Sequence, residues 1–294
     1  MSLEITTAQK VQFAQNYLML SQQKVSRLRN AVMLEGGVSG KRFSRDQIGT
    51  TSARKRTTRH ADTPRMDTPH RRRWANMYDY DWADLVDTLD KLKTIADPTN
   101  EYAQAASAAM GRAIDDEIIN AAFATAITGE EAGGTEAWSG NVVAVNSWAY
   151  GSGSGNAGLT VSKVIEAKVM LDTGEVDPDE ERFFACTGAQ IGQLLATTEA
   201  TSADYNTVKT LAEGKIDTFC GFKFIRIERL LLNGSSQRRC MAWSKSGLCL
   251  GIGAEPKTEI GPRADKNYAT QVFTEMSIGA TRMELAKVVE IICA

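Results

Sequence analysis

The hexapeptide GSGNAG at residues 153–158 fits the pattern G-x-G-x-x-G, in which glycines let a loop approach the pyrophosphate of a dinucleotide. It follows the strand-like NVVAV and precedes a segment with helical spacing, as in an NAD-binding oxidoreductase. However, Thr160 is typical of a helix N-cap, which places Gly158 outside the helix, whereas the last glycine of this pattern lies inside it. The acidic residues 177–181 also precede the next strand, and a ribose-binding acid should follow it. We therefore expect a mobile glycine loop at Gly153 and no bound cofactor.

The two histidines, His60 and His70, lie among arginines whose charge would repel a metal cation, and no cysteine stands beside them. They predict no zinc site, and two histidines in a segment without a core also disfavour general-base or Ser-His-Asp chemistry. DYDWAD at residues 79–84 starts like a calcium loop but lacks the glycine at its sixth position and the closing glutamate. The residue types therefore predict neither a catalytic nor a metal site, and the protein is expected not to be an enzyme.

The 294 residues are 43% hydrophobic and 24% charged, which suits one large globular domain or two smaller ones. The opening MSLEITTAQKVQ lacks the features of a signal peptide, and no run of about 18 apolar residues occurs, so we expect neither secretion nor a membrane partner. The cysteines are odd in number and scattered without a CxxC pair, which predicts buried, reduced thiols. They are Cys186, Cys220, Cys240, Cys249 and Cys293.

Charge is distributed unevenly along the chain. From Lys41 to Arg73 there are eleven Lys or Arg residues and three Asp, a local net charge of +8, so the rest of the chain carries −10 of the total of −2. This asymmetry predicts that the basic segment meets an acidic partner, either nucleic acid or the acidic body of another copy. The segment has no interleaved aromatic side chains for base stacking and no recognition helix beside it, so ion pairs between copies are the favoured alternative.

The same segment holds two Asp-Thr-Pro triplets, ending at Pro64 and Pro69, and each proline favours an extended conformation in the residue before it. Large apolar side chains are scarce, so the segment cannot form its own core. We expect two long strands, roughly 40–58 and 66–80, in a projecting loop. A loop of this length in a compact domain is unusual unless it is functional or docks elsewhere.

Three helices are predicted before residue 130. Residues 8–33 have a mixed helical pattern, and Trp82, Leu85, Val86, Leu89, Leu92 and Ile95 have the three-and-four spacing of an amphipathic helix. A much longer helix should run from about Thr99 to Thr128 and stop at Gly129, with Asp115 on its polar side.

The second half alternates helical and strand patterns, which predicts an α/β lobe: TVSKVIEAKVMLD is helical, ERFFACTG a strand, AQIGQLLAT and SADYNTVKTLAEG helical, and FKFIRIERLLL a strand. RRCMAWSKSGLCLGIG predicts two paired strands with a turn at residues 245–247. From Tyr268 onward the alternation around Gly279 predicts a long terminal hairpin, so the chain should end inside a sheet.

This order of parts resembles the Hong Kong 97-type α+β fold of tailed-phage major capsid proteins. The matching parts would be an N-terminal arm (1–36), an extended E-loop (37–80), a peripheral domain with a spine helix and antiparallel strands (81–158), an α/β axial domain (159–261) and return strands of the peripheral domain (262–294). Residues 130–158 have no counterpart in the resemblance. The amino-acid sequence is also similar to that family in six segments: KRTTRHADTP, RRRWANMYDYDWADL, EYAQAASAAMGRAIDDEIINAAF, EVDPDEERFFACTG, TSADYNTVKTLAEGKIDTFCGFKFIR and YATQVFTEMSIGATRMELAKVVEI.

The resemblance implies a virion protein that assembles in the cytoplasm of a bacterial host into an icosahedral shell of hexamers and pentamers around double-stranded DNA. It also implies a separate scaffolding protein, because the chain begins almost at the arm, together with a portal protein and a possible cement protein. The residues expected to make contacts between subunits in the E-loop are Arg54, Lys55, Arg56, Arg59, Arg71, Arg72 and Arg73. Three alternatives stay open: an encapsulin-like compartment for protein cargo, the more remote NAD-binding oxidoreductase, and a soluble DNA-binding protein, which would bind duplex DNA as a monomer with a steep salt dependence.

Overall fold

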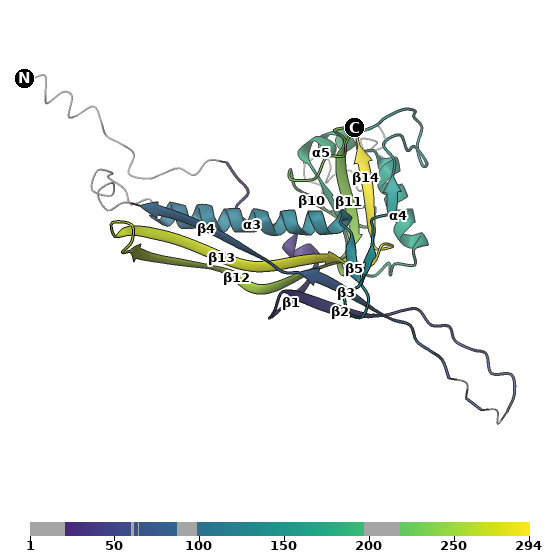
Figure 1. Ribbon diagram of the computed structural model, residues 1–294. Helices are drawn as coiled ribbons and strands as arrows, with labels where there is room; N and C mark the ends of the chain where they lie inside the picture. Colours follow the sequence, from purple (N-terminus) through teal and green to yellow (C-terminus); the bar gives the residue numbers. More distant parts are fainter. Residues whose placement is uncertain (1–20, 60–61, 64, 87–98, 197–217) are drawn as a thin grey trace, which may run out of the picture. The chain divides into compact units, whose positions relative to one another are not determined.

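The computed structural model describes residues 21–59, 62–63, 65–86, 99–196 and 218–294 (Figure 1). The chain divides into two compact units. Of the described residues, 21–26, 79–86, 99–114 and 254–278 belong to the first unit, and the others belong to the second. The five-part division derived from the sequence stays a prediction. In the part of the chain that the structure describes, no helix is both long and apolar enough to cross a membrane.

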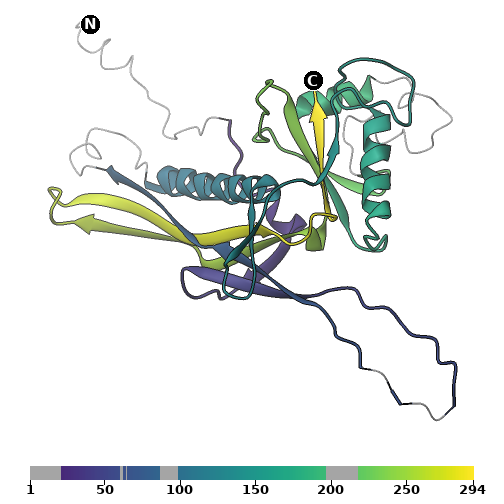
Figure 2. The same ribbon diagram turned by 45° about the vertical axis from the view of Figure 1, so that its right-hand side comes forward.

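A four-stranded sheet has the order β1-β12-β13-β4. Its strands are β1 (Met33–Gly36), β12 (Leu248–Arg263), β13 (Ala269–Arg282) and β4 (Tyr78–Val86). In the first unit, helix α3 (Thr99–Phe123) lies along the sheet beside β13 and β4 (Figures 1 and 2). Val272, Thr274, Met276 and Ile278 alternate along β13 and are buried. Their period of two shows which face of this strand is covered.

Strand β4 replaces the start of the amphipathic helix predicted for residues 82–95, so that prediction is wrong for residues 82–86; residues 87–95 lie outside the described residues. The spacing of Trp82 and Val86 fits a helix, but it also fits a period of two. Along β4 the half-buried Tyr80 and Trp82 alternate with the exposed Asp79 and Asp81. Residues 78–86 form a strand because they pair with β13, and such tertiary contacts override a weak local pattern.

The second unit contains a six-stranded sheet of order β7-β14-β11-β8-β10-β9. Its strands are β7 (Asn141–Val143), β14 (Val288–Cys293), β11 (Arg238–Ser244), β8 (Arg182–Cys186), β10 (Phe222–Arg226) and β9 (Thr218–Phe219). Helix α4 (Val161–Thr173) precedes β8 in the chain and helix α5 (Gly188–Leu195) follows it, as the alternating pattern predicts. Every residue of β8 is buried, which fits a strand in the interior of a sheet. Residues 202–214, expected to be helical, lie outside the described residues.

The two hairpins predicted for residues 238–294 are not formed. Strand β11 pairs with β14 and β8, whereas β12 pairs with β1, so the 3-10 turn η2 (Lys245–Gly247) connects two different sheets. Strand β13 also runs straight through Gly279, and β14 lies in the other sheet. A Cβ at Gly279 would lie 2.1 Å from the backbone oxygen of Asn76, so this glycine permits a close backbone approach instead of a turn. The prediction that the chain ends inside a sheet is correct, because β14 lies between β7 and β11.

Helix α3 ends at Phe123, five residues before the predicted end. The buried guanidinium of Arg282 donates to the carbonyl oxygens of Ala122 (2.8 Å) and Ala124 (2.9 Å), which the helix itself leaves without partners. The chain then forms β5 (Ala126–Thr128), and Gly129, with φ of 95°, begins the turn to β6 (Gly134–Glu136). Gly129 therefore ends a strand and not the helix.

The helix predicted for residues 8–33 is wrong for residues 21–33, which contain only the 3-10 turn η1 (Arg29–Ala31) before β1; residues 8–20 lie outside the described residues. Asp115, expected on the polar side of α3, is buried instead. Its carboxylate accepts the backbone N–H of Arg27 (3.1 Å) and of Leu28 (3.0 Å). Because these groups bond to α3, they do not bond to carbonyl groups of their own segment, as a helix would require.

Four of the five cysteines are buried free thiols, as expected, and Cys220 is half-buried. Burial raises the pKa of the Cys186 thiol to about 12 and that of Cys249 to about 11. These two thiols therefore stay protonated at neutral pH and act as small apolar side chains.

Candidate assembly surface at the basic loop

The basic segment is anchored by an antiparallel pair, β2 (Arg42–Ile48) and β3 (His70–Asn76). Both strands are shorter than the predicted 40–58 and 66–80, and the described residues between them form no strand. With β5 and β6 they make a third sheet of order β2-β3-β5-β6. Its inner side packs on a buried cluster of Phe43, Ala75, Cys249 and Met283. The core therefore fixes the base of the loop and leaves the described residues between 50 and 69 outside it.

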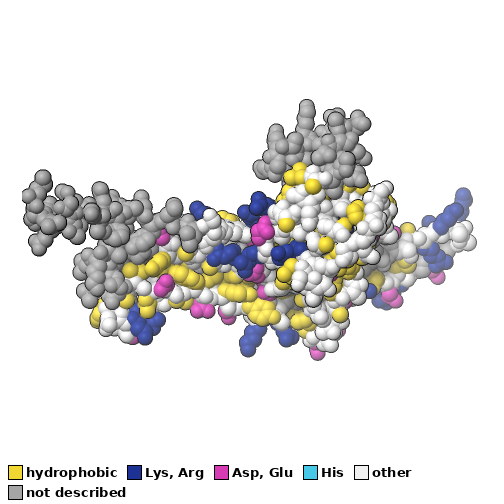
Figure 3. Space-filling view, turned by 90° about the horizontal axis from the view of Figure 1, so that it is seen from above, with side chains coloured by type: hydrophobic (Ala, Val, Ile, Leu, Met, Phe, Trp, Pro, Cys, Tyr) yellow, Lys and Arg dark blue, Asp and Glu magenta, His cyan; other side chains and the backbone are white. Residues whose placement is uncertain are grey.

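We define the basic loop as residues 50–69. All of its described residues are exposed. In Figures 1 and 2 its two arms run outward from β2 and β3, and Figure 3 shows Lys and Arg side chains gathered toward its far end. Its cations are Arg54, Lys55, Arg56, Arg59 and Arg65. Arg65 lies 3.6 Å from Asp67 in a fully exposed pair, and Arg56 donates to the backbone oxygen of Thr58 at 3.1 Å.

Arg72 lies directly opposite Asp46 in the β2–β3 pair. Its guanidinium donates from Nε to Oδ1 (2.5 Å) and from Nη2 to Oδ2 (3.1 Å) of this carboxylate. These hydrogen bonds lower the pKa of Asp46 and raise the pKa of Arg72 from their ordinary values. Both side chains are partly exposed, so the pair fixes the local geometry more than it stabilises the fold.

Arg73 points to the opposite side of β3 and is buried. Its Nη2 forms an ion pair with Glu136 of β6, and its Nε donates to the backbone oxygen of Met283 at 2.7 Å. Gln47 donates to the same oxygen at 3.1 Å. These bonds tie the hairpin base to β6 and to the segment after β13.

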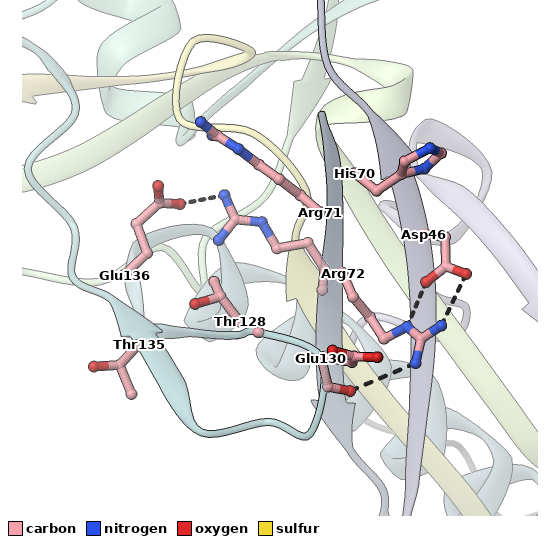
Figure 4. A pocket seen from close by; sticks show the side chains of 10 residues that line it. Asp46, His70, Arg71, Arg72, Thr128, Glu130, Thr135 and Glu136 are labelled. Atoms are coloured by element: carbon pink, nitrogen blue, oxygen red, sulfur yellow. Dashed lines mark hydrogen bonds and ion pairs between the residues drawn. The ribbon is translucent and has the colours of Figure 1, made fainter. Parts of the chain in front are cut away.

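A pocket of about 720 Å³ lies at the loop base, between the β2–β3 pair and the β5–β6 pair (Figure 4). Asp46 and Arg72 lie together on one side of it, whereas Arg71 extends toward the side of Glu136. Arg71 is exposed and forms no ion pair with a described residue. Of the three adjacent arginines of β3, Arg71 is therefore the one that is open to an external partner. Among the described residues, no group of three or more His, Cys, Asp or Glu side chains is placed to hold a metal.

The glycine-rich hexapeptide has a geometry unsuited to a dinucleotide. The Thr160 hydroxyl accepts the backbone N–H of Lys163 at 3.4 Å, so α4 begins after Gly158, as its sequence predicts. A Cβ at Gly153 would lie 2.5 Å from the Trp148 ring, and one at Gly158 would lie 2.1 Å from the Gln193 amide oxygen. The protein's own side chains therefore occupy the space that a pyrophosphate needs beside these glycines.

The family model described as "Phage capsid protein" matches residues 5–294. The chain belongs to this phage capsid family. It is a major capsid protein that assembles with copies of itself into the shell of a phage head, and it has the Hong Kong 97-type fold that the sequence predicts. Membership of this family favours a phage shell protein over the encapsulin-like and oxidoreductase alternatives.

Solved phage capsids share the fold of this capsid protein across almost its whole length. The chain from Mycobacterium phage Che8 has a TM-score of 0.71 at 14% identity and covers 95% of each chain. The capsid of cyanophage P-SCSP1u has a TM-score of 0.74 at 13% identity, covering 98% of this chain and 94% of that one. The head of Helicobacter pylori bacteriophage KHP40 has a TM-score of 0.73 at 10% identity, covering 99% and 98%. No curated protein matches in sequence.

The structure separates the seven predicted contact residues of the capsid protein into two groups. Arg72 and Arg73 bind carboxylates of their own chain, whereas the other five are exposed and form no ion pair with a described residue. These five are Arg54, Lys55, Arg56, Arg59 and Arg71. The sequence did not predict Asp46 as the partner of Arg72 or Glu136 as the partner of Arg73. The register of β2 and β3 would have revealed Asp46, but a connection of about twenty residues does not fix a register.

Proposed function

We propose that this capsid protein forms an icosahedral shell of hexamers and pentamers around double-stranded DNA, and that the basic loop holds neighbouring subunits together. The exposed cations Arg54, Lys55, Arg56 and Arg59, with Arg71 at the loop base, form ion pairs with acidic side chains of an adjacent subunit. The observation that carries the proposal is the full exposure of a loop with four cations and no carboxylate between residues 50 and 59.

The physical argument is the cost of ordering this loop. Fixing the backbone of each residue costs about 1–2 kcal/mol of conformational entropy. Every described residue of the loop is exposed, so burial in its own subunit offsets little of this cost. A neighbouring subunit supplies the missing contacts. Charged contacts between subunits select the correct partner and register more than they add affinity. The acidic balance of the rest of the chain provides carboxylates for them.

Reversal of charge in the loop tests the proposal. The variant Arg56→Glu/Arg59→Glu should reduce the yield of closed particles at least tenfold, measured by gradient sedimentation and electron microscopy, because like charges then meet across the interface. Its matched control, Arg56→Lys/Arg59→Lys, keeps both charges and should assemble. Circular dichroism and the thermal midpoint of unassembled subunits should be unchanged in both variants. Normal particle yield from the charge-reversed variant contradicts the proposal.

The remaining partners follow from the same proposal. The shell is built in the host cytoplasm on a separate scaffolding protein, joins a portal protein, receives a cement protein where one exists, and encloses DNA without catalysing a reaction. Nuclease-treated native particles should therefore keep absorbance near 260 nm and release double-stranded DNA when they are opened. Particles that contain only protein would contradict the packaging of DNA.

A further inference from the structure

Strand β4 lies at one end of the sheet β1-β12-β13-β4, and among the described residues no strand pairs with its outer edge. An edge strand presents backbone N–H and C=O groups that can pair with another extended chain. Most of β4 is exposed, with only Val86 buried and Tyr80 and Trp82 half-buried. The edge therefore offers both backbone partners and accessible side chains.

Strand β4 is negatively charged. Asp79, Asp81 and Asp84 are exposed, and the nine residues of the strand contain no Lys or Arg. None of the three forms an ion pair with a described residue. Because side chains alternate along a strand, Asp79 and Asp81 point to the same face, about 7 Å apart. The edge thus carries, at a fixed spacing, two carboxylates that form no ion pair with a cation of the described residues.

The outgoing arm of the basic loop has the complementary properties. Residues 50–59, TTSARKRTTR, carry four cations and no acid, and all ten are exposed. In Figure 2 this arm leaves the β2–β3 pair as an extended chain. Arg54 and Arg56 are two residues apart, so in an extended arm they share the spacing of Asp79 and Asp81. A strand pair between the two segments would place opposite charges across from each other in either direction.

We propose that the arm at residues 50–59 of one subunit docks along the outer edge of β4 of a second copy, with Arg54 and Arg56 against Asp79 and Asp81. This inference rests on the proposed function and names the acidic partner of the loop. A second copy is the occupant because the chain assembles with itself, and because the arm matches β4 in charge, spacing and extended form. The competing explanation is that the aspartates only keep a free sheet edge from aggregating.

Zero-length crosslinking of assembled particles identifies the partner directly. Lys55 is the single lysine between residues 42 and 90, and a carbodiimide joins its amine to a carboxylate in contact with it, forming an amide with loss of water. Particles assembled from a mixture of ¹⁴N-labelled and ¹⁵N-labelled subunits should give mixed-isotope peptides that join Lys55 to Asp79, Asp81 or Asp84. The control Lys55→Arg keeps the charge, so it should assemble and lose only this crosslink. Crosslinks from Lys55 to other carboxylates alone overturn the inference.

A charge exchange tests the same contact through assembly. Arg54→Asp/Arg56→Asp and Asp79→Lys/Asp81→Lys should each lower particle yield at least tenfold, and the combined variant should recover most of the loss. If the aspartate variant assembles normally while the arginine variant does not, the basic loop functions in assembly but β4 is not its partner. If the arginine variant assembles normally, the proposed function itself fails. Aggregation of the aspartate variant without rescue in the combined variant supports edge protection and overturns the docking.

Discussion

Arg72 and Asp46 lie directly opposite each other on β3 and β2, joined by two hydrogen bonds from one guanidinium to one carboxylate. On the other side of β3, Arg73 forms an ion pair with Glu136. Two of the seven cations expected at the subunit interface are thus engaged within their own chain. Sequence position alone does not distinguish them from Arg71, because all three arginines are adjacent.

Removing the guanidinium of Arg72 should change the titration of Asp46. The hydrogen bonds lower the pKa of Asp46 in the folded subunit, so their contribution to stability is present above the unfolded pKa and is lost as pH falls through the folded pKa. In Arg72→Gln the pKa of Asp46 should rise toward its ordinary value, measured by NMR of the side-chain carboxyl group. Arg71→Gln, on the same strand, should leave it unchanged. An unchanged Asp46 titration in Arg72→Gln would contradict the pairing.

Substitution of Arg73 should lower the stability of the subunit, whereas substitution of Arg71 should impair assembly. Arg73→Met removes a buried ion pair and a hydrogen bond to the Met283 carbonyl, so it should lower the free energy of unfolding of the subunit by about 2–3 kcal/mol. Arg71→Met should leave urea unfolding unchanged and reduce particle yield. Equal effects of the two variants on unfolding would show that Arg71 also has a partner within the subunit.

Glu290 is buried on β14 and binds Arg239 through both carboxylate oxygens, at 2.5 and 3.0 Å, and the Trp138 indole N–H at 2.8 Å. Glu290→Leu should therefore cost about 3–5 kcal/mol in urea unfolding, because it leaves the Arg239 guanidinium without its counter-charge. The double variant Glu290→Leu/Arg239→Met should cost less than the sum of the single variants. Additive losses would show that the two side chains are not coupled.

Gly279 should not tolerate a side chain. Gly279→Ala would bring a Cβ within 2.1 Å of the Asn76 backbone oxygen, so it should lower the thermal midpoint by several degrees or prevent folding. Gly192→Ala in α5 is the matched control: its Cβ meets nothing within 4 Å, and it should stabilise the subunit by about 0.4–1 kcal/mol. A neutral Gly279→Ala variant would show that β13 and the β3–β4 connection can move apart.

Thiol reactivity should follow burial. In native, unassembled subunits at pH 8, a thiol reagent should modify Cys220 first, because the other four thiols are buried and the thiolate forms of Cys186 and Cys249 are scarce at their raised pKa values. All five should react after unfolding in urea. Cys220→Ser should abolish the rapid phase, and rapid reaction of a second thiol in that variant would contradict the packing.

Local patterns predicted those elements that local chemistry determines. The cap at Thr160, the buried strand β8 and the start of α3 all follow from neighbouring residues. The local sequence patterns gave wrong predictions where contacts with residues far away in the sequence determine the structure. Arg282 ends α3 from 160 positions away in the sequence, and Asp115 removes the backbone partners of Arg27 and Leu28 across 88 and 87 positions.

The sequence predicted where the candidate assembly surface lies, but not which of its arginines are exposed. Charge counting located the basic loop, because a run of cations without a core is visible in the sequence. It could not separate the engaged Arg72 and Arg73 from the exposed Arg71, since that depends on the register of β2 and β3 and on the position of β6. The acidic edge of β4 was hidden by a hydrophobic spacing that also fits a helix.

The position of β14 has a consequence for biosynthesis. Residues 288–293 fill the place between β7 (Asn141–Val143) and β11 (Arg238–Ser244), so both neighbours leave the ribosome well before the strand that joins them. The six-stranded sheet therefore cannot be completed while these earlier residues are being synthesised, and until β14 emerges the edge strand β7 has no partner strand in this sheet. A polypeptide truncated before residue 288 therefore lacks a finished lobe.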